Sequence, residues 1–249
     1  MSSLKTHTRL VIGNWKMNGT LVSNTTLLAG LVDGVSAVDA CELVVCVPFP
    51  YLAQAAAALP AGRIALGAQD VSSQSAGAYT GEVAAAMLID IGVTWVLVGH
   101  SERRSQHGET SQLVADKAQA ALDAGLTPVV CVGETLSEHD AGQALAVIAA
   151  QLQPVLALGA QAVAKMVIAY EPVWAIGTGQ TATPQQAQEV HASIRASLVA
   201  LGVPQVRILY GGSVTAANAA SLFSMSDING ALVGGASLVA EEFLRIAAA

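Results

Sequence analysis

Short apolar, β-branched runs alternate with longer alanine-rich segments along the whole chain. Eight of these runs have the composition of buried strands, and roughly 20–40 residues separate one from the next, as strand-plus-helix units require. We expect the strands at residues 9–13, 43–47, 64–68, 95–98, 128–132, 166–170, 206–210 and 228–233. The alternation therefore predicts an α/β fold with a parallel sheet.

The segments between the expected strands are rich in Ala, Leu and Gln, which favour helices. The clearest helix candidates are residues 84–91, 111–124, 141–158 and 184–201. No Pro-, Gly- or Ser-rich linker divides the chain, so eight βα units in 249 residues predict one closed (β/α)8 barrel domain, residues 1–249. A doubly wound open sheet is the alternative, but no G-x-G-x-x-G motif follows the first expected strand.

The composition argues against several classes of partner. Hydrophobic residues make up 53% of the chain and charged residues 12%, which is enough for a large core. The net charge of −7 argues against nucleic-acid and anionic-membrane partners. Cys41, Cys46 and Cys131 form no C-x-x-C motif, which favours free thiols in a reducing compartment. With no apolar signal segment and no long apolar window, we expect a cytoplasmic protein.

Unusual residues gather just beyond the carboxyl ends of five expected strands, the face where barrel active sites are built. They lie in the segments GNWKMN at 13–18, GHSERR at 99–104, EPVWAIGTG at 171–179, GGSV at 211–214 and GGAS at 234–237. Each segment alone has an ordinary structural interpretation: a surface lysine, a structural histidine, a strand-end glutamate or tight glycine turns. Their position at one end of the same barrel favours a functional site.

Glu171 is the expected general base, because it ends a buried strand and a short hinged segment follows it. Residues 172–179 combine Pro172, an apolar centre and a glycine-rich end, which is the composition of a mobile lid that excludes water. His100 precedes an expected helix, whose dipole disfavours the imidazolium and predicts a neutral ring. Lys16 lies among apolar residues, which suggests a charge held in a pocket.

The strings NWKMN, GHSERR, YEPVWAIGTG, YGGSV, VGGASL and GAYTGE resemble the signature segments of the triosephosphate isomerase family, in order and across essentially the whole chain. The resemblance implies a TIM barrel that interconverts dihydroxyacetone phosphate and D-glyceraldehyde 3-phosphate through an enediolate, in glycolysis and gluconeogenesis. It implies Glu171 as base, His100 as neutral electrophile and proton shuttle, and Lys16 as electrostatic stabiliser. A neutral histidine is an established feature of this family. Gln180 stands where the family more often has Lys, which casts doubt on a contact at the end of the lid.

The same resemblance implies the supporting residues. Asn14 orients Lys16 and the substrate, and Glu102 pairs with Lys16. The substrate phosphate is bound by the N–H groups of Gly177, Ser213, Gly234 and Gly235. It further implies a homodimer in which the loop with Thr80 and Glu82 reaches the partner, with Arg103 as the expected ion-pair partner of Glu82. No metal and no cofactor is expected, because the sequence shows no ligand cluster and Lys16 would repel a cation.

Two other functions remain as alternatives. Another phosphate-binding barrel enzyme would share the glycine pairs, but it would not need NWKMN, GHSER and EPVW together. A non-catalytic sugar-phosphate-binding protein would have no need to keep Glu171, His100 and Lys16, and all three are present. The sequence says nothing about an additional assembly role.

Overall fold

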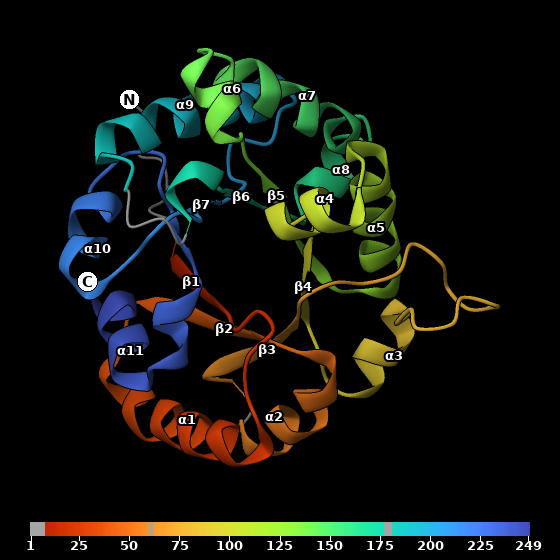
Figure 1. Cartoon of the computed structure of the whole chain (residues 1–249), viewed down its shortest axis with the longest axis vertical. Helices are drawn as coiled ribbons and strands as arrows, with labels where there is room; N and C mark the ends of the chain where they lie inside the picture. Colours follow the sequence, from red (N-terminus) through yellow and green to blue (C-terminus); the bar gives the residue numbers. More distant parts are fainter. Residues whose placement is uncertain (1–7, 60–61, 177–180) are drawn as a thin grey trace.

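The strands close into a parallel barrel. The structure is a computed structural model, and it describes residues 8–59, 62–176 and 181–249. The strand order around the barrel follows the sequence, from β1 to β8, and β8 pairs with β1 (Figure 1). The strands are β1 (Arg9–Asn14), β2 (Cys41–Val47), β3 (Ile64–Ala68), β4 (Trp95–Val98), β5 (Thr127–Val132), β6 (Val167–Tyr170), β7 (Ile208–Tyr210) and β8 (Gly230–Val233). The expected (β/α)8 barrel is confirmed.

Helices form the outer ring around these strands (Figure 1). The α-helices are α1 (Leu21–Gly34), α2 (Leu52–Ala58), α3 (Ala85–Asp90), α4 (Ser101–His107), α5 (Ser111–Ala124), α6 (Leu136–Asp140), α7 (Ala144–Leu156), α8 (Ala160–Val163), α9 (Pro184–Ala200), α10 (Ala216–Phe223) and α11 (Ala240–Ala248). Short 3-10 turns are η1 (Val35–Ala37), η2 (Phe49–Tyr51), η3 (Val173–Ala175) and η4 (Gly235–Leu238).

Two strands and one helix are shorter than expected, because a turn occupies part of each predicted segment. Val206 and Ile228 are buried and apolar, but their N–H groups donate to turn carbonyls at Val203 and Met225. The strands β7 and β8 therefore begin two residues later than their apolar runs. The expected helix 141–158 is shorter for a similar reason, because Gly142 has a φ of 69° and separates α6 from α7.

Alternate residues of each strand enter two different apolar layers. In β1, Leu10 and Ile12 belong to the cluster inside the barrel, whereas Val11 belongs to the larger cluster between strands and helices. This is the period of two that a strand imposes on side-chain direction. Because both layers are apolar, polar groups are concentrated at the strand ends and in the loops that follow them.

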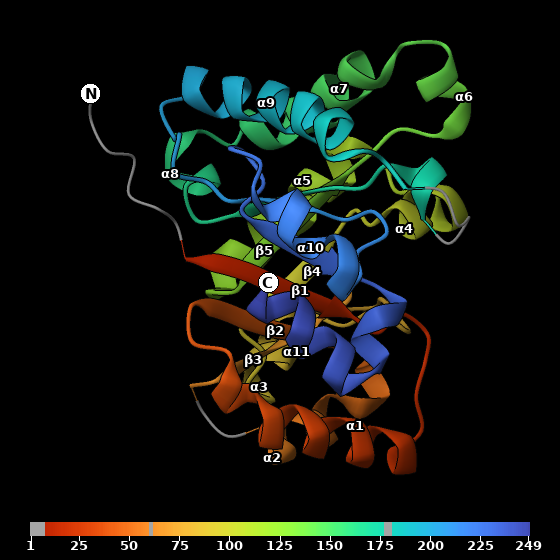
Figure 2. The ribbon, with the colours of Figure 1, turned by 90° about the vertical axis from the view of Figure 1, so that its left-hand side faces the viewer.

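The carboxyl ends of the strands point to one end of the barrel. In Figure 2 the arrow of β1 points toward the end where α4 and α6 also lie, and these helices follow β4 and β5 in the chain. The parallel register sets neighbouring strand ends side by side, with Asn14 opposite Cys46 and Val132 opposite Tyr170. Residues that are distant in sequence therefore meet at this end.

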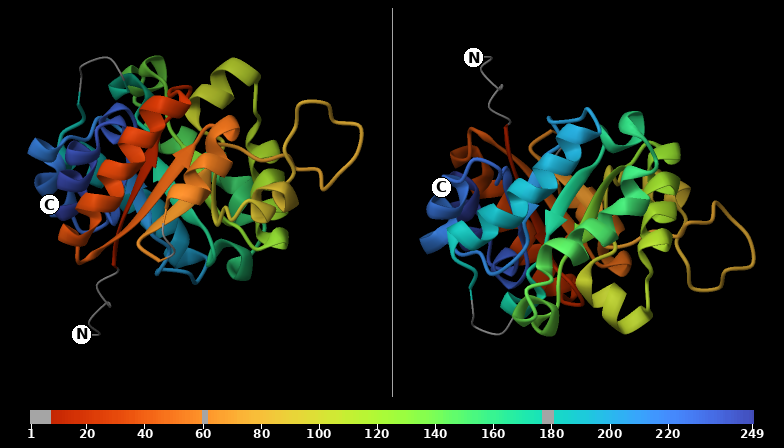
Figure 3. Two further views of the ribbon diagram at one scale, coloured as in Figure 1. Left: turned by 90° about the horizontal axis from the view of Figure 1, so that it is seen from below. Right: turned by 90° about the horizontal axis from the view of Figure 1, so that it is seen from above.

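The segment between β3 and α3 leaves the barrel as a long protruding loop (Figure 3). Its base is closed by the N–H of Ser72, which donates to the carbonyl of Val83 at 2.8 Å. Tyr79 and Thr80 are exposed residues of this loop. Within the described ranges, no helix combines the length and apolarity needed to cross a membrane.

The buried side chain of His191 makes the stability of the fold depend on pH in the acid range. Its ring is fully buried in α9, and Nδ1–H donates to the carbonyl of Asp227 at 3.0 Å. Burial lowers the pKa of His191 from 6.5 to about 4, although the contact with Asp227 opposes this shift. In the unfolded chain the ring takes up a proton near pH 6.5, so the unfolded state binds protons before the folded state does. The linked stability is present above pH 6.5 and is lost as the pH falls toward 4.

We expect His191→Gln to reduce the acid sensitivity of the fold. The difference between the two pKa values corresponds to about 3 kcal/mol of unfolding free energy lost between pH 7 and pH 4. Urea unfolding at both pH values measures this loss for the wild type, for His191→Gln and for the control His107→Gln at an exposed position. An equal loss in all three proteins would contradict the assignment to His191.

Candidate active site

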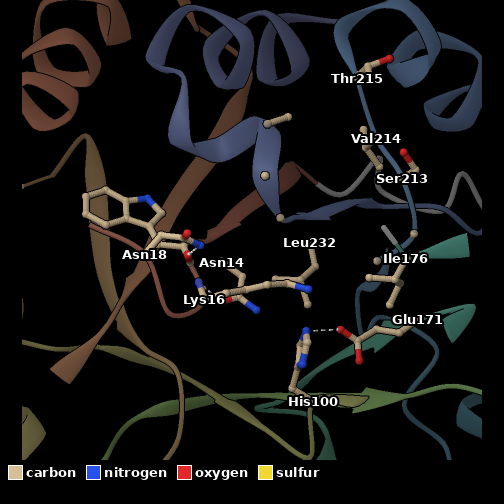
Figure 4. Close-up of a pocket in the computed structure, with 16 residues that line it drawn as sticks. Asn14, Lys16, Asn18, His100, Glu171, Ile176, Ser213, Val214, Thr215 and Leu232 are labelled. Carbon is tan, nitrogen blue, oxygen red and sulfur yellow. Dashed lines mark hydrogen bonds and ion pairs between the residues drawn. The ribbon is translucent and has the colours of Figure 1, made fainter. Parts of the chain in front are cut away.

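A cavity of about 340 Å³ lies at the carboxyl end of the barrel (Figure 4). Its walls come from the ends of β1, β4, β6, β7 and β8. Among the lining residues are Asn14, Lys16, His100, Glu171, Ile176, Ser213, Gly234 and Gly235. The structure thus brings together the residues expected from the five separate segments, with the exception of Gly177, which lies outside the described residues.

Lys16 sits on a turn that the chain holds in an unfavourable backbone conformation. Its φ is 52°, and it is the one non-glycine residue with positive φ in the described part of the chain. Such a conformation costs ~1–2 kcal/mol for a residue with a side chain. The Asn14 side chain accepts from the Lys16 N–H at 3.0 Å, and the Gln69 amide donates to the Lys16 carbonyl at 3.0 Å. These two bonds hold the turn that carries the lysine.

The Lys16 side chain is directed to the cavity by an ion pair. Nζ lies 2.7 Å from Oε1 of Glu102, in the first turn of α4. The pairing expected from the resemblance is present. Lys16 therefore stands in the cavity wall with a fixed position and a positive charge.

His100 is the N-cap of α4. Its Nδ1 accepts from the N–H of Glu102 at 3.2 Å, which requires an unprotonated Nδ1. The proton of a neutral ring then lies on Nε2, which faces Oε1 of Glu171 at 2.8 Å. The helix start therefore selects the tautomer that presents an N–H to the cavity.

Glu171 is 1% exposed and holds its carboxylate between two donors. One oxygen faces His100, and the other accepts from the N–H of Ser101 at 2.9 Å. Two glycines make room for it: a Cβ on Gly133 would lie 1.9 Å from the Glu171 carbonyl oxygen, and a Cβ on Gly211 would lie 2.9 Å from its Cγ. No other residue type fits at Gly133 without a shift of β5 or β6.

The contacts of Glu171 lower the pKa of its carboxyl by more than burial raises it. Burial raises the pKa of the carboxyl, but His100, the Ser101 N–H and the charge of Lys16 together hold the pKa below its usual value. In this arrangement Glu171 is an ionised and well-stabilised carboxylate.

The contact with Glu171 also shifts the pKa of the His100 ring. Burial lowers the pKa of the ring and Lys16 acts in the same direction, but the neighbouring Glu171 carboxylate raises the pKa above its ordinary value. The helix start alone predicted a lowered pKa, and this direction is wrong while Glu171 contacts the ring. The expected neutral ring agrees with the hydrogen bond that Nδ1 accepts from the Glu102 N–H. The sequence argument did not include a carboxylate from a different strand.

The two glycine pairs, after β7 and β8, line the same cavity as His100. Ser213 follows β7, and Gly234 is the N-cap of η4 after β8. Backbone N–H groups at such turns, with no side chain at the glycines, can approach an anion closely. Ser213, Gly234 and Gly235 all line the cavity. Gln180 lies outside the described residues.

Comparison with known proteins decides the family. The sequence model of the family described as "Triosephosphate isomerase" matches residues 9–249. The protein named triosephosphate isomerase of Bordetella pertussis is 66% identical over 249 residues, which are 100% of both chains. Those of Paracidovorax citrulli and Nitrosomonas eutropha are 57% and 52% identical, and the alignments cover 98% and 97% of this chain and 99% and 97% of theirs.

The chain belongs to the triosephosphate isomerase family. It is an isomerase that interconverts dihydroxyacetone phosphate and D-glyceraldehyde 3-phosphate, a step of glycolysis. Its substrate is accordingly a small phosphorylated triose.

Three polar residues that support this isomerase site were not found from the sequence. Gln69 donates to the carbonyls of Lys16 and Cys46, both at 3.0 Å. The Arg104 guanidinium donates to the carbonyls of Gly99 and Cys131, beneath the turn that carries His100. Glu134 accepts from the indole N–H of Trp174 at 2.7 Å. All three follow the carboxyl end of an expected strand, and this position is the sequence feature that could have identified them.

Arg103 has different partners in the single chain from the one expected. It pairs with Asp70 at 2.9 Å and with Glu109 at 2.6 Å, and not with Glu82. Thr80 and Glu82 belong to the protruding loop, which extends away from the barrel (Figure 3). A pairing of Glu82 with Arg103 of a second copy stays a prediction.

We expect Glu171→Gln to lower the pKa of His100 in the isomerase, because the variant removes the carboxylate that stabilises the imidazolium and leaves burial and Lys16 to act. The histidine ring resonances of the unliganded protein, followed by NMR from pH 5 to 8.5, measure this change. Glu189→Gln at an exposed site of α9 is the matched control and is expected to have no effect. An unchanged or higher pKa of His100 in Glu171→Gln would contradict the electrostatic assignment.

Proposed function

We propose that Glu171, His100 and Lys16 are the catalytic residues of the isomerisation. The observation that carries this proposal is their convergence: three side chains from β6, α4 and the end of β1 line one cavity, with Glu171 and His100 in contact at 2.8 Å. The reaction moves a proton between two adjacent carbons and requires a base, a donor to the carbonyl oxygen and a nearby positive charge. These three groups provide each of those functions.

In the proposed sequence Glu171 removes a proton from the carbon beside the carbonyl, and the carbonyl π electron pair moves onto its oxygen, which accepts a hydrogen bond from the Nε2–H of His100. The electron pair of the broken C–H bond forms the carbon–carbon double bond of the enediolate. His100 then exchanges protons with the two oxygens, and protonated Glu171 returns its proton to the neighbouring carbon. Lys16 stabilises the negative charge on the intermediate. Asn14 and Glu102 hold the position of Lys16.

Binding of substrate changes the electrostatics of Glu171. A substrate oxygen that takes the Nε2–H of His100 removes one of the donors that lower the pKa of Glu171. Burial, which raises the pKa, then has less opposition, and the carboxylate becomes a stronger base. Separation of the pair also removes the charge that raises the pKa of His100, so the neutral ring expected from the helix start is favoured during the reaction.

The N–H groups of Ser213, Gly234, Gly235 and Gly177 are the proposed binding site of the substrate phosphate. The support is that Ser213 and the glycine pair after β8 line the same cavity as His100 and Glu171. Residues 172–179 are the proposed lid. Its support is that Ile176 lines the same cavity, where it limits the access of water to Glu171.

We expect Glu171→Gln to lower kcat by ~10²–10⁴-fold, because an amide of the same shape cannot accept the carbon-bound proton. A coupled assay with D-glyceraldehyde 3-phosphate measures kcat, using protein from a host that lacks its own isomerase. Inorganic phosphate binding tests whether the site is intact, and Glu189→Gln is the matched control. Wild-type turnover in Glu171→Gln would refute the assignment of the base.

We also propose that the protein is a cytoplasmic homodimer and that the protruding loop forms the dimer contact. Met17, Tyr79 and Met87 are exposed apolar residues, with 96%, 47% and 56% of their surface accessible. Met17 adjoins Lys16, so a partner loop that carries Thr80 would support the turn that carries the lysine. The described cysteines are free, which is typical of a reducing compartment.

Shortening of residues 72–79 is expected to give monomers with much lower activity, because each Lys16 turn would lose the partner loop. Sedimentation measures the oligomeric state, and the coupled assay measures kcat and KM on the same samples. A shortened monomer with full activity would contradict the proposed role of the loop.

A further inference from the structure

His139 lies beside the segment that follows the proposed base. It belongs to α6, and its ring stacks on the indole of Trp174, with ring centroids 4.3 Å apart and an interplanar angle of 30°. Its Nδ1 lies 3.6 Å from Oε1 of Glu134. A third of its side chain is exposed, so the ring can exchange protons with solvent.

Glu134 is the group that joins His139 to Trp174. Its side chain is 0% exposed. One carboxylate oxygen accepts from the Trp174 indole at 2.7 Å and from the Tyr170 hydroxyl at 3.0 Å. The other oxygen has no hydrogen-bond partner among the described residues. A buried carboxylate held mainly by neutral donors is sensitive to a positive charge brought beside it.

No other described carboxylate lies within ion-pair distance of His139. On its own helix, Glu138 turns its carboxylate to the N–H and hydroxyl of Thr135, and Asp140 is exposed. The elements most closely packed against α6 are α7 and η3, and neither contains a titratable side chain. A charge on His139 therefore acts chiefly on Glu134 and on the face of Trp174.

We propose that His139 is a pH-sensitive positioning residue for Trp174. The protonated ring adds a cation–π contact with the indole and an opposite charge beside Glu134, and both hold Trp174 in the position seen here. The neutral ring keeps only the stacking contact. Trp174 follows Glu171 by three residues, so the charge on His139 sets how firmly the start of the proposed lid is held. This link to turnover rests on the proposed lid function, whereas the positioning of Trp174 does not.

The direct test follows the indole N–H of Trp174 by NMR in the unliganded protein from pH 8.5 to 5.5. We expect its resonance to titrate with the same midpoint as the His139 ring. In His139→Gln the titration disappears, and in His139→Arg the low-pH resonance persists at every pH, because that side chain keeps its charge. His107→Gln, the matched control, leaves the titration unchanged. A titration that is absent from the wild type, or that survives in His139→Gln, would overturn the proposal.

The second test is the pH profile of kcat and KM for wild type and His139→Gln. Cation–π contacts at exposed sites correspond to about a 2- to 5-fold change in an equilibrium. We expect the ratio of the wild-type kcat to that of His139→Gln to fall by about this factor between pH 8 and pH 6, because the charged ring resists movement of Trp174. A flat ratio, with the indole titration present, would overturn the link to turnover but not the positioning. The titrations of the Trp174 indole and the His139 ring are measured without substrate, so their outcome does not depend on Glu171 being the base.

Discussion

The site depends on one contact, between the carboxylate of Glu171 at the end of β6 and the ring of His100 at the start of α4. Neither group reaches the other through local structure, since 71 positions separate them in the chain. The contact exists because β5 lies between β4 and β6 in a parallel register that sets the three strand ends together. Gly133, at the end of β5, leaves the space that brings the Glu171 backbone close.

In the unliganded site, each group of this contact shifts the pKa of the other toward its charged form. Glu171 is stabilised as a carboxylate, and the same carboxylate stabilises a proton on His100. The proposed chemistry requires a stronger base at Glu171 and a neutral ring at His100 during the reaction. In the proposed mechanism, a substrate that separates the pair favours both changes at once, so binding energy contributes to activating the site.

Charged residues behind α4 connect the cavity with the protruding loop. Arg103, next to Glu102 in α4, pairs with Asp70 near the loop base and with Glu109. Lys117 from α5 also contacts both carboxylates. Burial raises the pKa of Asp70, while the two cations counteract that shift. Because these groups are largely buried, loss of one partner leaves an uncompensated charge, and the loop base and α4 are held as one unit.

The order of the elements, the barrel and the functional segments could be predicted from the sequence. β-branched runs and alanine-rich segments have local preferences that persist in the fold, and a parallel sheet places every strand end on the same side. Glu171, His100 and Lys16 were therefore found as strand-end residues. The first residues of β7 and β8 were placed two positions too early, because the carbonyls of Val203 and Met225 accept the backbone hydrogen bonds of Val206 and Ile228.

Tertiary structure decided the properties that depend on neighbours from other strands. The pKa of His100 is raised, and not lowered as the helix start predicts, because the Glu171 carboxylate reaches the ring from β6. Arg103 forms ion pairs with Asp70 and Glu109 instead of Glu82. The stacking of His139 on Trp174 likewise joins α6 to η3. Local sequence determines which side chains stand at the end of each strand, since backbone preference acts over a few residues. Charge and hydrogen bonding act through space, so their outcome depends on which of those ends the barrel brings together.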